Sequence, residues 1–443
     1  FLNLIDLLED HQTVSNEVLY KRLWEAYQYS KDHHQGQLRK SGRPYFEHCV
    51  AVAELLAEWH MDLNTIIGGI LHDCIEDTNS TFEEIEKEFG EEVAQLVDGV
   101  TKLGGVHLGS RRDQQADNLM KMFLSMAKDL RVIIIKFADR LHNMRTLEYL
   151  PIIKQHRIAV ETRDVYCPLA HRLGMFRIKS ELDNLVLGTL EPDTFKGIEK
   201  LLKSTGGRRR RTLKEISEPI EDRLIEYNID YNIKTRLKSH SSIHNKMVSR
   251  DKPFDEIYDI FALRILVKNI AHCYTALGLI HQVFTPVHER FKDFVATPKS
   301  NGYQSLHTTI IAPSGKMVEI QIRTNEMDHN AEIGVAAHWK YKEGKGNGSL
   351  DHHVGWLRDL VAILRDESAD PKEFMNLLKI DLFQNEVFVF TPAGDLIQLP
   401  SGSTPIDFAY GVHTEIGNHC LSAKIDGKIV PLNTELKSGE TVE

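Results

Sequence analysis

The first 190 residues place apolar positions three and four apart, which is the spacing of amphipathic helices. The segments EVLYKRLWEAYQYSKDHH (17–34) and FEEIEKEFGEEVAQLVDGV (82–100) show this pattern clearly. The segment RVIIIKFADRLHNM (131–144) is mixed, because its β-branched run favours a strand while its continuation favours a helix. We predict a helix there, within an all-α region from residue 1 to about 190.

A different pattern begins near residue 254. The segments YDIFALRILV (258–267) and KMVEIQIR (316–323) alternate or run apolar as strands do. Between them AHCYTALGLIHQVF (271–284) is helix-like. This mixture predicts an α/β or α+β domain.

Two polar stretches interrupt these patterns. KSTGGRRRR (203–211) combines a glycine pair with four arginines and favours a solvated loop between domains; the alternative is an RNA or nucleotide contact. KEGKGNG (342–348) predicts a flexible break, followed by one helical segment. From residue 385 short strands dominate, and NEVFVFTPAGDLIQLP predicts a hairpin that turns around Pro392 to Gly394.

Composition limits the class of protein. The 443-residue chain has 54 lysines and arginines against 64 acids, a formal charge of −10 that argues against bulk nucleic-acid binding. Five scattered cysteines without a CxxC pair fit a reducing compartment rather than a disulfide framework or zinc ribbon. The start, FLNLIDLLED, is acidic, unlike a signal peptide, and no stretch suits a membrane span. We expect a cytoplasmic enzyme, and the ending SGETVE, in mid-strand, suggests a longer natural protein.

The segment LHDCIEDT places a histidine and three carboxylates directly after the apolar run NTIIGGIL. If residues 66–76 form one helix, His72 shares a row with Glu76, and Asp73 shares the adjacent row with Asp77. Such groups resist burial together unless a positive charge lies among them. Imidazole with carboxylates suits Mn²⁺ better than a structural zinc ion. The alternative is that His72 caps a helix and the acids form a solvated face.

Two ligands are too few for a metal ion, and two further polar residues stand alone in apolar helical stretches. His48 lies in YFEHC, and Asp139 lies in KFADRLHN. The candidate metal ligands are therefore His48, His72, Asp73 and Asp139.

The segment RFKDFVATPKSNGYQSLHTT (290–309) mixes basic residues with a tyrosine that offers a flat face for a base, Tyr303. The basic residues that can hold phosphates are Arg290, Lys292, Lys299 and His307. No GxxxxGK[ST] loop occurs in the chain. Asp259 and Glu319 lie on predicted strands, and two acids on adjacent strands suit Mg²⁺ bridging ATP phosphates. The alternative is a basic surface loop with acids on edge strands.

Several strings resemble the hydrolase domain of the long RelA/SpoT-type (p)ppGpp synthetase/hydrolases, a branch of the HD-domain metal-dependent phosphohydrolases. They are RKSGRPYFEH, GGILHDCIEDT, DGVTKL and KFADRLHNMRTL. The resemblance implies that the four ligands hold Mn²⁺ and that Glu76 and Asp77 handle the attacking water. It also implies a nucleotide pocket lined by Arg39, Lys40, Asn143 and Thr146. The expected reaction removes pyrophosphate from the 3′ position of (p)ppGpp.

A second group of strings resembles the synthetase domain of the same family: YDIFALRILV, RFKD, NGYQSLHTT, VEIQIRT and AAHWKYKEG. The resemblance implies that Asp259 and Glu319 hold Mg²⁺, that Glu319 is the candidate base, and that Tyr303 stacks on guanine. The resemblance also implies which residues surround the GDP or GTP acceptor and the ATP phosphates. They are Arg236, Lys238, Lys246, Arg290, Lys292, Lys299, Asn301, His307 and Gln321. The family usually has Gly before Arg236 and aromatic residues where Ser241 and His244 stand. These differences affect the expected contacts to adenine more than the expected contacts to the ATP phosphates. The basic form RFKD is associated with bifunctional members.

Residues 385–443, which include STPIDFAYGVHTEIGNHC, resemble a TGS domain, a small ubiquitin-like β-grasp. In this family the domain reads the 3′ end of deacylated tRNA on the ribosome, and His413 matches the contact position. The alternative is that His413 is a turn residue of the fold.

These expectations combine into a multidomain chain. We predict an all-α HD-type hydrolase domain (1–190), a central helical linker (191–215), an α/β synthetase domain with a mixed sheet (216–345), a helical linker (346–384) and a β-grasp TGS domain (385–443). The expected function is a bifunctional alarmone enzyme of the stringent response. It uses ATP and GDP or GTP to make (p)ppGpp, and its two sites are coupled oppositely through residues 150–215. The alternatives are one active site only, or a ribosome-associated regulator that senses nucleotides.

Overall fold

The computed structural model describes residues 1–443 except 10–15, 105–127, 258–259, 300, 337–385 and 438. The chain divides into two compact units, Phe1–Asp366 and Glu367–Glu443. The predicted break at 342–348 and the helical linker at 346–384 lie outside the described residues, as does Asp259.

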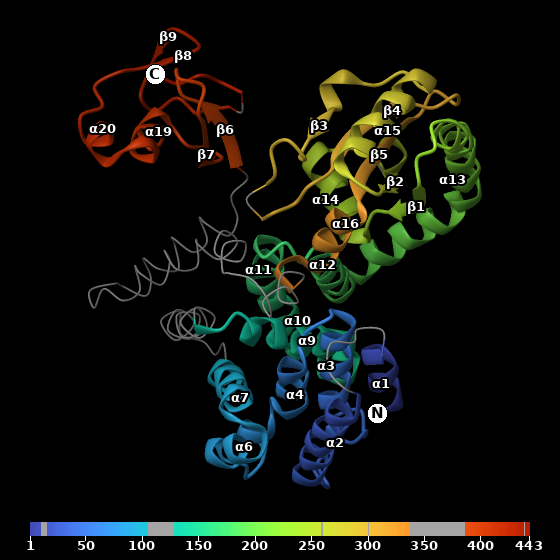
Figure 1. Ribbon diagram of the computed structural model, residues 1–443, viewed down its shortest axis with the longest axis vertical. Helices are drawn as coiled ribbons and strands as arrows, with labels where there is room; N and C mark the ends of the chain where they lie inside the picture. Colours follow the sequence, from blue (N-terminus) through green and yellow to red (C-terminus); the bar gives the residue numbers. More distant parts are fainter. Residues whose placement is uncertain (10–15, 105–127, 258–259, 300, 337–385, 438) are drawn as a thin grey trace. The chain divides into compact units, whose positions relative to one another are not determined.

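The first part of the larger unit is built of helices joined by turns, with no strand among its described residues (Figure 1). Its helices are α1 (Leu2–Glu9), α2 (Asn16–His33), α3 (Phe46–Glu58), α4 (Leu63–Leu71), α5 (Cys74–Asp77), α6 (Phe82–Phe89), α7 (Glu91–Gly104), α9 (Arg131–Arg145), α10 (Ile152–Glu161), α11 (Cys167–Arg172) and α12 (Phe176–Leu190). The mixed segment at 131–144 is α9, so the prediction of a helix there is confirmed.

Helix α4 carries the apolar run that precedes the His–Asp pair. Asp62 caps its first turn by accepting the N–H of Thr65 at 3.0 Å. Every residue from Thr65 to Leu71 is buried. A Cβ at Gly69 would overlap the side chain of Leu56, so glycine lets α4 approach α3 closely. This packing fixes the end of α4, where the polar residues begin.

The condition that residues 66–76 form one helix is not met. Helix α4 ends at Leu71 and α5 begins at Cys74, with the His–Asp pair at the break between them. Nδ1 of His72 donates to the carbonyl oxygen of Gly69 at 2.8 Å, the acceptor that a continuous helix would give to the N–H of Asp73. The expected side-chain rows therefore do not form as one helix face.

The second part of the larger unit holds a five-stranded sheet of order β1-β2-β5-β4-β3 (Figure 1). Its strands are β1 (Tyr231–Leu237), β2 (Phe261–Val267), β3 (Lys292–Asp293), β4 (Leu306–Ile311) and β5 (Met317–Thr324). Strands β2 and β5 pair in parallel, and the other neighbours pair antiparallel. The accompanying helices are α13 (Pro192–Glu226), α14 (His240–Arg250), α15 (Ile270–Val283) and α16 (Asn325–Ile333). The predicted mixed α/β class is confirmed.

The predicted loop at 203–211 is wrong, because α13 runs through it as one helix of 35 residues. Before the glycine pair, Ile198 and Leu202 lie in one buried cluster. After it, α13 contributes buried residues to the core beneath the sheet: Leu213, Ile216, Ile220 and Leu224. Apolar burial on both sides outweighs about 1 kcal/mol per helical glycine. The expected domain boundary at 215/216 falls inside this helix.

The described residues of the smaller unit form two hairpins and two short helices. They are β6 (Glu386–Phe390), β7 (Leu396–Pro400), α19 (Pro405–Val412), α20 (Thr414–Asn418), β8 (Ala423–Ile425) and β9 (Lys428–Val430). β6 and β7 pair antiparallel, and Gly394 in the turn has a φ of 91°, so the predicted hairpin is confirmed. A parallel bridge joins Phe390 to Thr441.

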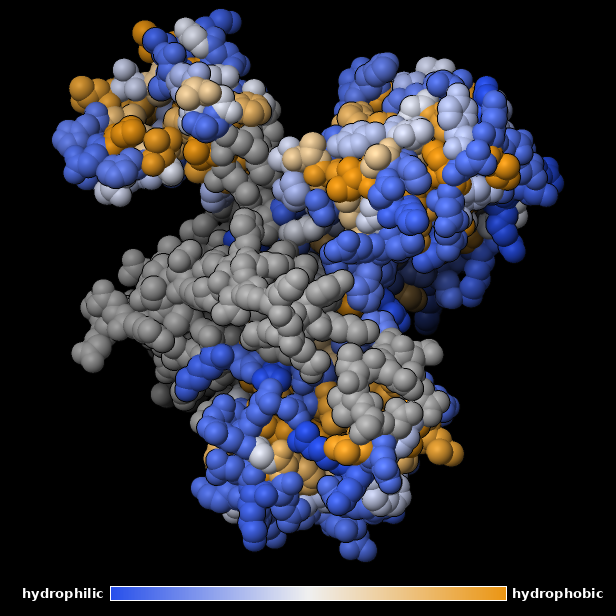
Figure 2. Space-filling view, viewed as in Figure 1, coloured by the Kyte–Doolittle hydropathy of each residue, from blue (hydrophilic) through white to orange (hydrophobic). Residues whose placement is uncertain are grey.

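Among the described residues, no helix is both long and apolar enough to cross a membrane. In the view of Figure 2, hydrophilic side chains predominate on the visible surface of the helical part and of the sheet part.

Candidate metal centre and nucleotide pockets

Three separate elements bring the four predicted ligands together. His48 lies in the first turn of α3, His72 and Asp73 lie at the break between α4 and α5, and Asp139 lies in α9. Nε2 of His48 is 3.3 Å from Oδ1 of Asp139 and 3.6 Å from Oδ2 of Asp73. All four residues are at least nine-tenths buried. The structure therefore forms a buried cluster of the kind that binds a metal ion.

The hydrogen bonds of His72 are compatible with a cation bound between His72 and Asp73. Because Nδ1 of His72 donates to Gly69, Nε2 of the neutral imidazole carries the lone pair, and Nε2 has no hydrogen-bond partner among the described residues. Oδ2 of Asp73 lies 3.0 Å from this nitrogen. Two lone pairs so close in a buried site require a proton or a metal ion between them, so the residues fit a divalent ion.

The charges of the cluster are balanced in part by one buried lysine. Nζ of Lys136 lies 2.7 Å from Oδ2 of Asp139. Burial opposes ionisation of Asp139, but Lys136 and His48 outweigh it and hold the pKa of Asp139 well below its usual value. For Asp73 burial is likewise outweighed, chiefly by His72, and its pKa is lowered. Both carboxylates are therefore available as anionic ligands.

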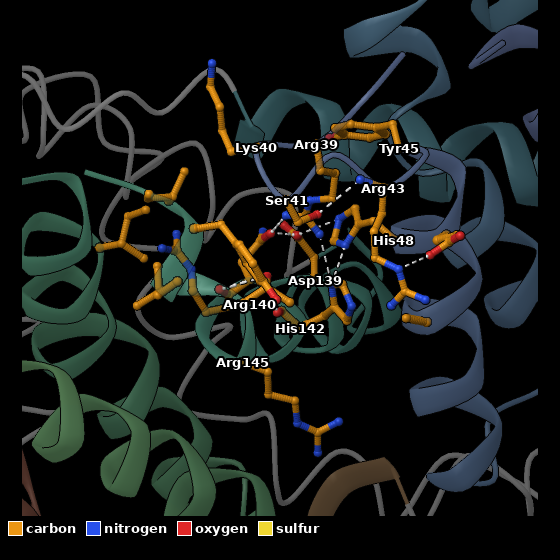
Figure 3. Close-up of a pocket in the computed structure, with 18 of the residues that line it drawn as sticks. Arg39, Lys40, Ser41, Arg43, Tyr45, His48, Asp139, Arg140, His142 and Arg145 are labelled. Carbon is orange, nitrogen blue, oxygen red and sulfur yellow. Dashed lines mark hydrogen bonds and ion pairs between the residues drawn. The ribbon is translucent and has the colours of Figure 1, made fainter. Parts of the chain in front are cut away.

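The cluster opens into a cavity of about 790 Å³ whose lining includes the four residues expected around the nucleotide: Arg39, Lys40, Asn143 and Thr146. Figure 3 shows Arg39 pointing toward His142 and Asp139, whereas Lys40 extends away from the cluster. Nδ2 of Asn143 donates to Oδ1 of Asp139 at 2.5 Å, and Arg39 donates to Oδ1 of Asn143. The predicted residues thus share one cavity, and one of them, Asn143, also contacts the metal cluster through Asp139.

Glu76 and Asp77 lie on α5, directly after the cluster. Loss of surrounding water raises the pKa of Glu76, and Asp73 and Asp77 add to this effect while Lys136 opposes it. Asp77 is tied to the chain, because its carbonyl oxygen accepts Nε2 of Gln37 at 2.7 Å. Neither acid lines the cavity as far as the structure describes it.

Sequence reasoning missed three residues at this site. Tyr45 donates its hydroxyl to Oδ2 of Asp73 at 2.8 Å. His142 contacts both Arg39 and His48. Burial, followed by the charges of His48 and Arg39, lowers the pKa of His142 to about 3. Lys136 carried a signal, since it is the one charge in RVIIIKF after the first arginine, whereas the other two required the fold.

A chain of hydrogen bonds crosses the sheet at the second site. Arg323 donates to the hydroxyl oxygen of Tyr303, and that hydroxyl donates to Nε2 of His307 at 2.7 Å. Nδ1 of His307 lies 3.3 Å from Oε1 of Glu319, which also accepts Nε2 of Gln321 at 2.7 Å. The predicted tyrosine and the predicted acid are therefore linked through His307.

The electrostatics keep Glu319 ionised. Burial opposes its charge, but His307 and Lys238 outweigh burial and lower the pKa of Glu319. Nζ of Lys238 is 3.8 Å from Oε2 of Glu319. Burial lowers the pKa of His307, which fits its role as acceptor for Tyr303.

A cavity of about 450 Å³ beside this chain is lined by Arg236, Lys299, Tyr303, His307 and Arg323, and by residues of α12. Arg236 donates to Oε1 of Gln321 at 3.2 Å. Nζ of Lys299 lies over the ring of Phe294, 4.9 Å from its centroid. Sequence reasoning missed Arg323, which is 1% exposed although it lies in the quoted string VEIQIRT.

Other predicted residues lie elsewhere. Nδ2 of Asn301 donates to the carbonyl oxygen of His171 at 3.2 Å. Lys246 on α14, Arg290 in a 3₁₀ turn and Lys292 on β3 are not among the described lining residues of this cavity.

Two of the three departures from the family pattern, Ser241 and His244, contact the helical part. The N–H of Ser241 donates to Oδ1 of Asn184 at 3.0 Å. Nε2 of His244 lies 3.6 Å from Oε2 of Glu191. Both therefore have structural partners in this chain.

In the smaller unit His413 is exposed between α19 and α20. Its Nδ1 accepts the N–H of Glu415 at 3.1 Å, which caps α20. The alternative role as a turn residue is thus visible in the fold, while contact with tRNA stays a prediction.

Comparisons with known proteins agree with this geometry. Three family models match: the HD domain over residues 26–176, the "Region found in RelA / SpoT proteins" over 235–346, and the TGS domain over 387–443. A GTP pyrophosphokinase from Myxococcus xanthus is 49% identical over 94% of this chain and 56% of its own length. The bifunctional (p)ppGpp synthase/hydrolase SpoT of Escherichia coli (strain K12) is 46% identical over 98% of this chain and 62% of its own length.

The chain thus spans 56% to 62% of the length of these two curated relatives. The solved small alarmone synthetase 2 from Bacillus subtilis is 26% identical and covers 38% of this chain and 94% of its own chain, with a TM-score of 0.26. The matches to these relatives cover 94% to 98% of this chain, and together with the three matched regions they place it in the RelA/SpoT family of (p)ppGpp synthetases/hydrolases, with HD, RelA_SpoT and TGS regions.

Proposed function

We propose that this chain is a bifunctional alarmone enzyme that makes (p)ppGpp at one site and hydrolyses it at the other. The observation that carries the proposal is the buried His–Asp cluster at the base of a cavity containing Arg39 and Asn143. The separate chain from Tyr303 to Glu319 supports the second activity. The names of the relatives, a GTP pyrophosphokinase and a bifunctional synthase/hydrolase, agree with both.

For hydrolysis, His48, His72, Asp73 and Asp139 would hold a divalent ion, and Mn²⁺ would suit these mixed imidazole and carboxylate ligands. When bound, such an ion supplies positive charge to the 3′-diphosphate and lowers the pKa of water. Glu76, with its raised pKa, accepts and returns a proton, and Asp77 orients the water beside it. Arg39 and Lys40 bind phosphates at the cavity. The water oxygen bonds to the phosphorus next to the 3′-oxygen, the bond between that phosphorus and the 3′-oxygen breaks, the 3′-oxygen takes the proton that Glu76 returns, and pyrophosphate leaves.

For synthesis, Tyr303 stacks on guanine, and Glu319 accepts the proton of the 3′-hydroxyl. The 3′-oxygen bonds to the β-phosphorus of ATP, the bond to the α-phosphate oxygen breaks, and AMP leaves. Asp259 and Glu319 would hold Mg²⁺, which would supply charge for the ATP phosphates. Arg236, Lys238, Lys246, Arg290, Lys292 and Lys299 supply further positive charge, with Asn301, His307 and Gln321 at the acceptor.

The smaller unit extends the proposal to partners. We infer that the TGS region contacts the ribosome and deacylated tRNA, with His413 as the candidate contact, and that the enzyme is cytoplasmic. His413 is exposed, which leaves its ring accessible for such a contact.

Two assays on the purified chain test the proposal. We expect (p)ppGpp and AMP from ATP plus GDP or GTP with Mg²⁺, and GDP or GTP plus pyrophosphate from (p)ppGpp with Mn²⁺. Nucleotide binding without turnover in either assay would instead support a nucleotide-sensing regulator. Turnover in one assay alone would support a chain with one active site.

A further inference from the structure

His142 joins the nucleotide cavity to the metal cluster. It lies on α9, three residues after Asp139, and lines the same cavity. Its Nδ1 is 2.7 Å from Nδ1 of His48 and 3.0 Å from Nη1 of Arg39, as the dashed lines in Figure 3 show. One nitrogen of His142 therefore meets two different partners.

The partners fix where the protons lie. A guanidinium only donates, so Nδ1 of His142 carries a lone pair that accepts from Arg39. The same lone pair faces Nδ1 of His48, which must therefore carry the proton and donate. His48 then has its lone pair on Nε2, the nitrogen that faces Asp73 and Asp139. This is the tautomer that a metal ligand requires.

We propose that His142 is a positioning residue that holds His48 in its metal-binding tautomer and orientation, and that Arg39 keeps His142 in the accepting form. Metal-binding histidines usually donate their second N–H to a carboxylate or a backbone carbonyl. Here the neutral imidazole of His142 accepts that N–H instead. The guanidinium of Arg39, which lines the nucleotide cavity, keeps Nδ1 of His142 as an acceptor. The inference rests on the proposed metal function of the cluster.

A parallel link strengthens the case for Arg39. It also donates to Oδ1 of Asn143, so the amide group of Asn143 is turned with Nδ2 toward Oδ1 of Asp139. One arginine thereby orients the partners of two ligands, His48 and Asp139. A residue expected to bind phosphate is also part of the support of the metal site.

Two variants of the full chain test the inference. His142→Asn keeps an acceptor oxygen near the position of Nδ1, whereas His142→Leu has a similar volume and no acceptor. The dissociation constant for Mn²⁺ alone is measured without nucleotide, from the electron paramagnetic resonance signal of free Mn²⁺. Circular dichroism and the synthesis assay at the second site establish that each variant is folded.

We expect His142→Leu to weaken Mn²⁺ binding by about 10- to 100-fold, and His142→Asn to stay within about threefold of the parent chain. Unchanged binding in the Leu variant, or equal weakening in both variants, would overturn the inference. A parent chain that binds Mn²⁺ but does not hydrolyse (p)ppGpp refutes the proposed function and leaves the inference standing. A folded parent chain that binds no Mn²⁺ overturns the inference.

Discussion

The ring of Phe176 meets the ring of Tyr303 edge-on, with centroids 5.4 Å apart and planes at 79°. Phe176 is the first residue of α12, so a helix of the first part of the larger unit lines the cavity in which Tyr303 is expected to bind guanine. It lies within residues 150–215, the segment through which we expect the two sites to be coupled. The contact gives that expectation a specific pair of residues.

Phe176→Ala should lower the KM for GDP in synthesis by roughly two- to tenfold, because an edge-to-face pair worth about 0.5–1.5 kcal/mol no longer competes with guanine. The matched control is Phe294→Ala, which removes another edge-on contact to Tyr303, at 5.9 Å, but also the ring beneath Lys299. Its KM should rise. Steady-state kinetics at saturating ATP measure both, and shifts of the same sign would contradict competition by Phe176.

Tyr303→Phe should lower kcat of synthesis by about fivefold or more while leaving the KM for GDP nearly unchanged. The ring that stacks is kept, but the hydroxyl that accepts from Arg323 and donates to His307 is lost, which costs about 1–3 kcal/mol for each unsatisfied buried partner. Tyr303→Ala should raise KM as well. A Phe variant with normal kcat would show that the chain to Glu319 is not needed for catalysis.

The reactivity of the cysteine thiols at pH 8 tests how tightly the buried cysteines are packed. Burial raises the pKa of Cys74 to about 12 and of Cys273 to about 11, and it also raises the pKa of Cys49 and Cys167. A raised pKa keeps the thiol protonated, and the thiolate is the reactive form. At pH 8 a disulfide reagent should therefore react quickly with Cys420 alone, and with all five cysteines after denaturation. Rapid modification of Cys49 or Cys74 in the native protein would contradict the packing around the metal cluster.

Gly69→Ala should destabilise the helical part by about 1–3 kcal/mol, because the new methyl group overlaps Leu56 in a packed core. Gly278→Ala on α15 is the control, since a Cβ there meets nothing within 4 Å. It should stabilise the chain by up to about 1 kcal/mol. Thermal unfolding measures both, and a neutral Gly69→Ala would mean that α4 and α3 do not pack as closely as described.

The four candidate ligands could be predicted from their setting: His48 and Asp139 are polar residues isolated in apolar helical stretches, and His72 and Asp73 directly follow an apolar run. The break at His72 could not be predicted, since it depends on a side-chain bond to Gly69. Nor could the role of His142, which depends on an approach between α3 and α9.

The error at 203–211 has a different cause. Glycine and arginine are local signals for a loop, but α13 is stabilised by apolar residues on both sides of that stretch, from Ile198 to Leu224. Those contacts are made in the folded chain, and the composition of residues 203–211 alone does not predict them.

The most direct test of two independent active sites is a crossed pair of variants, Asp73→Ala and Glu319→Gln, each assayed for both reactions. Asp73→Ala removes a ligand of the buried cluster, and Glu319→Gln removes the candidate base on β5. We expect Asp73→Ala to lose (p)ppGpp hydrolysis by about 1000-fold or more while synthesis continues, and Glu319→Gln to show the reverse. Loss of both reactions in either variant, or of neither, would contradict the proposal of two sites.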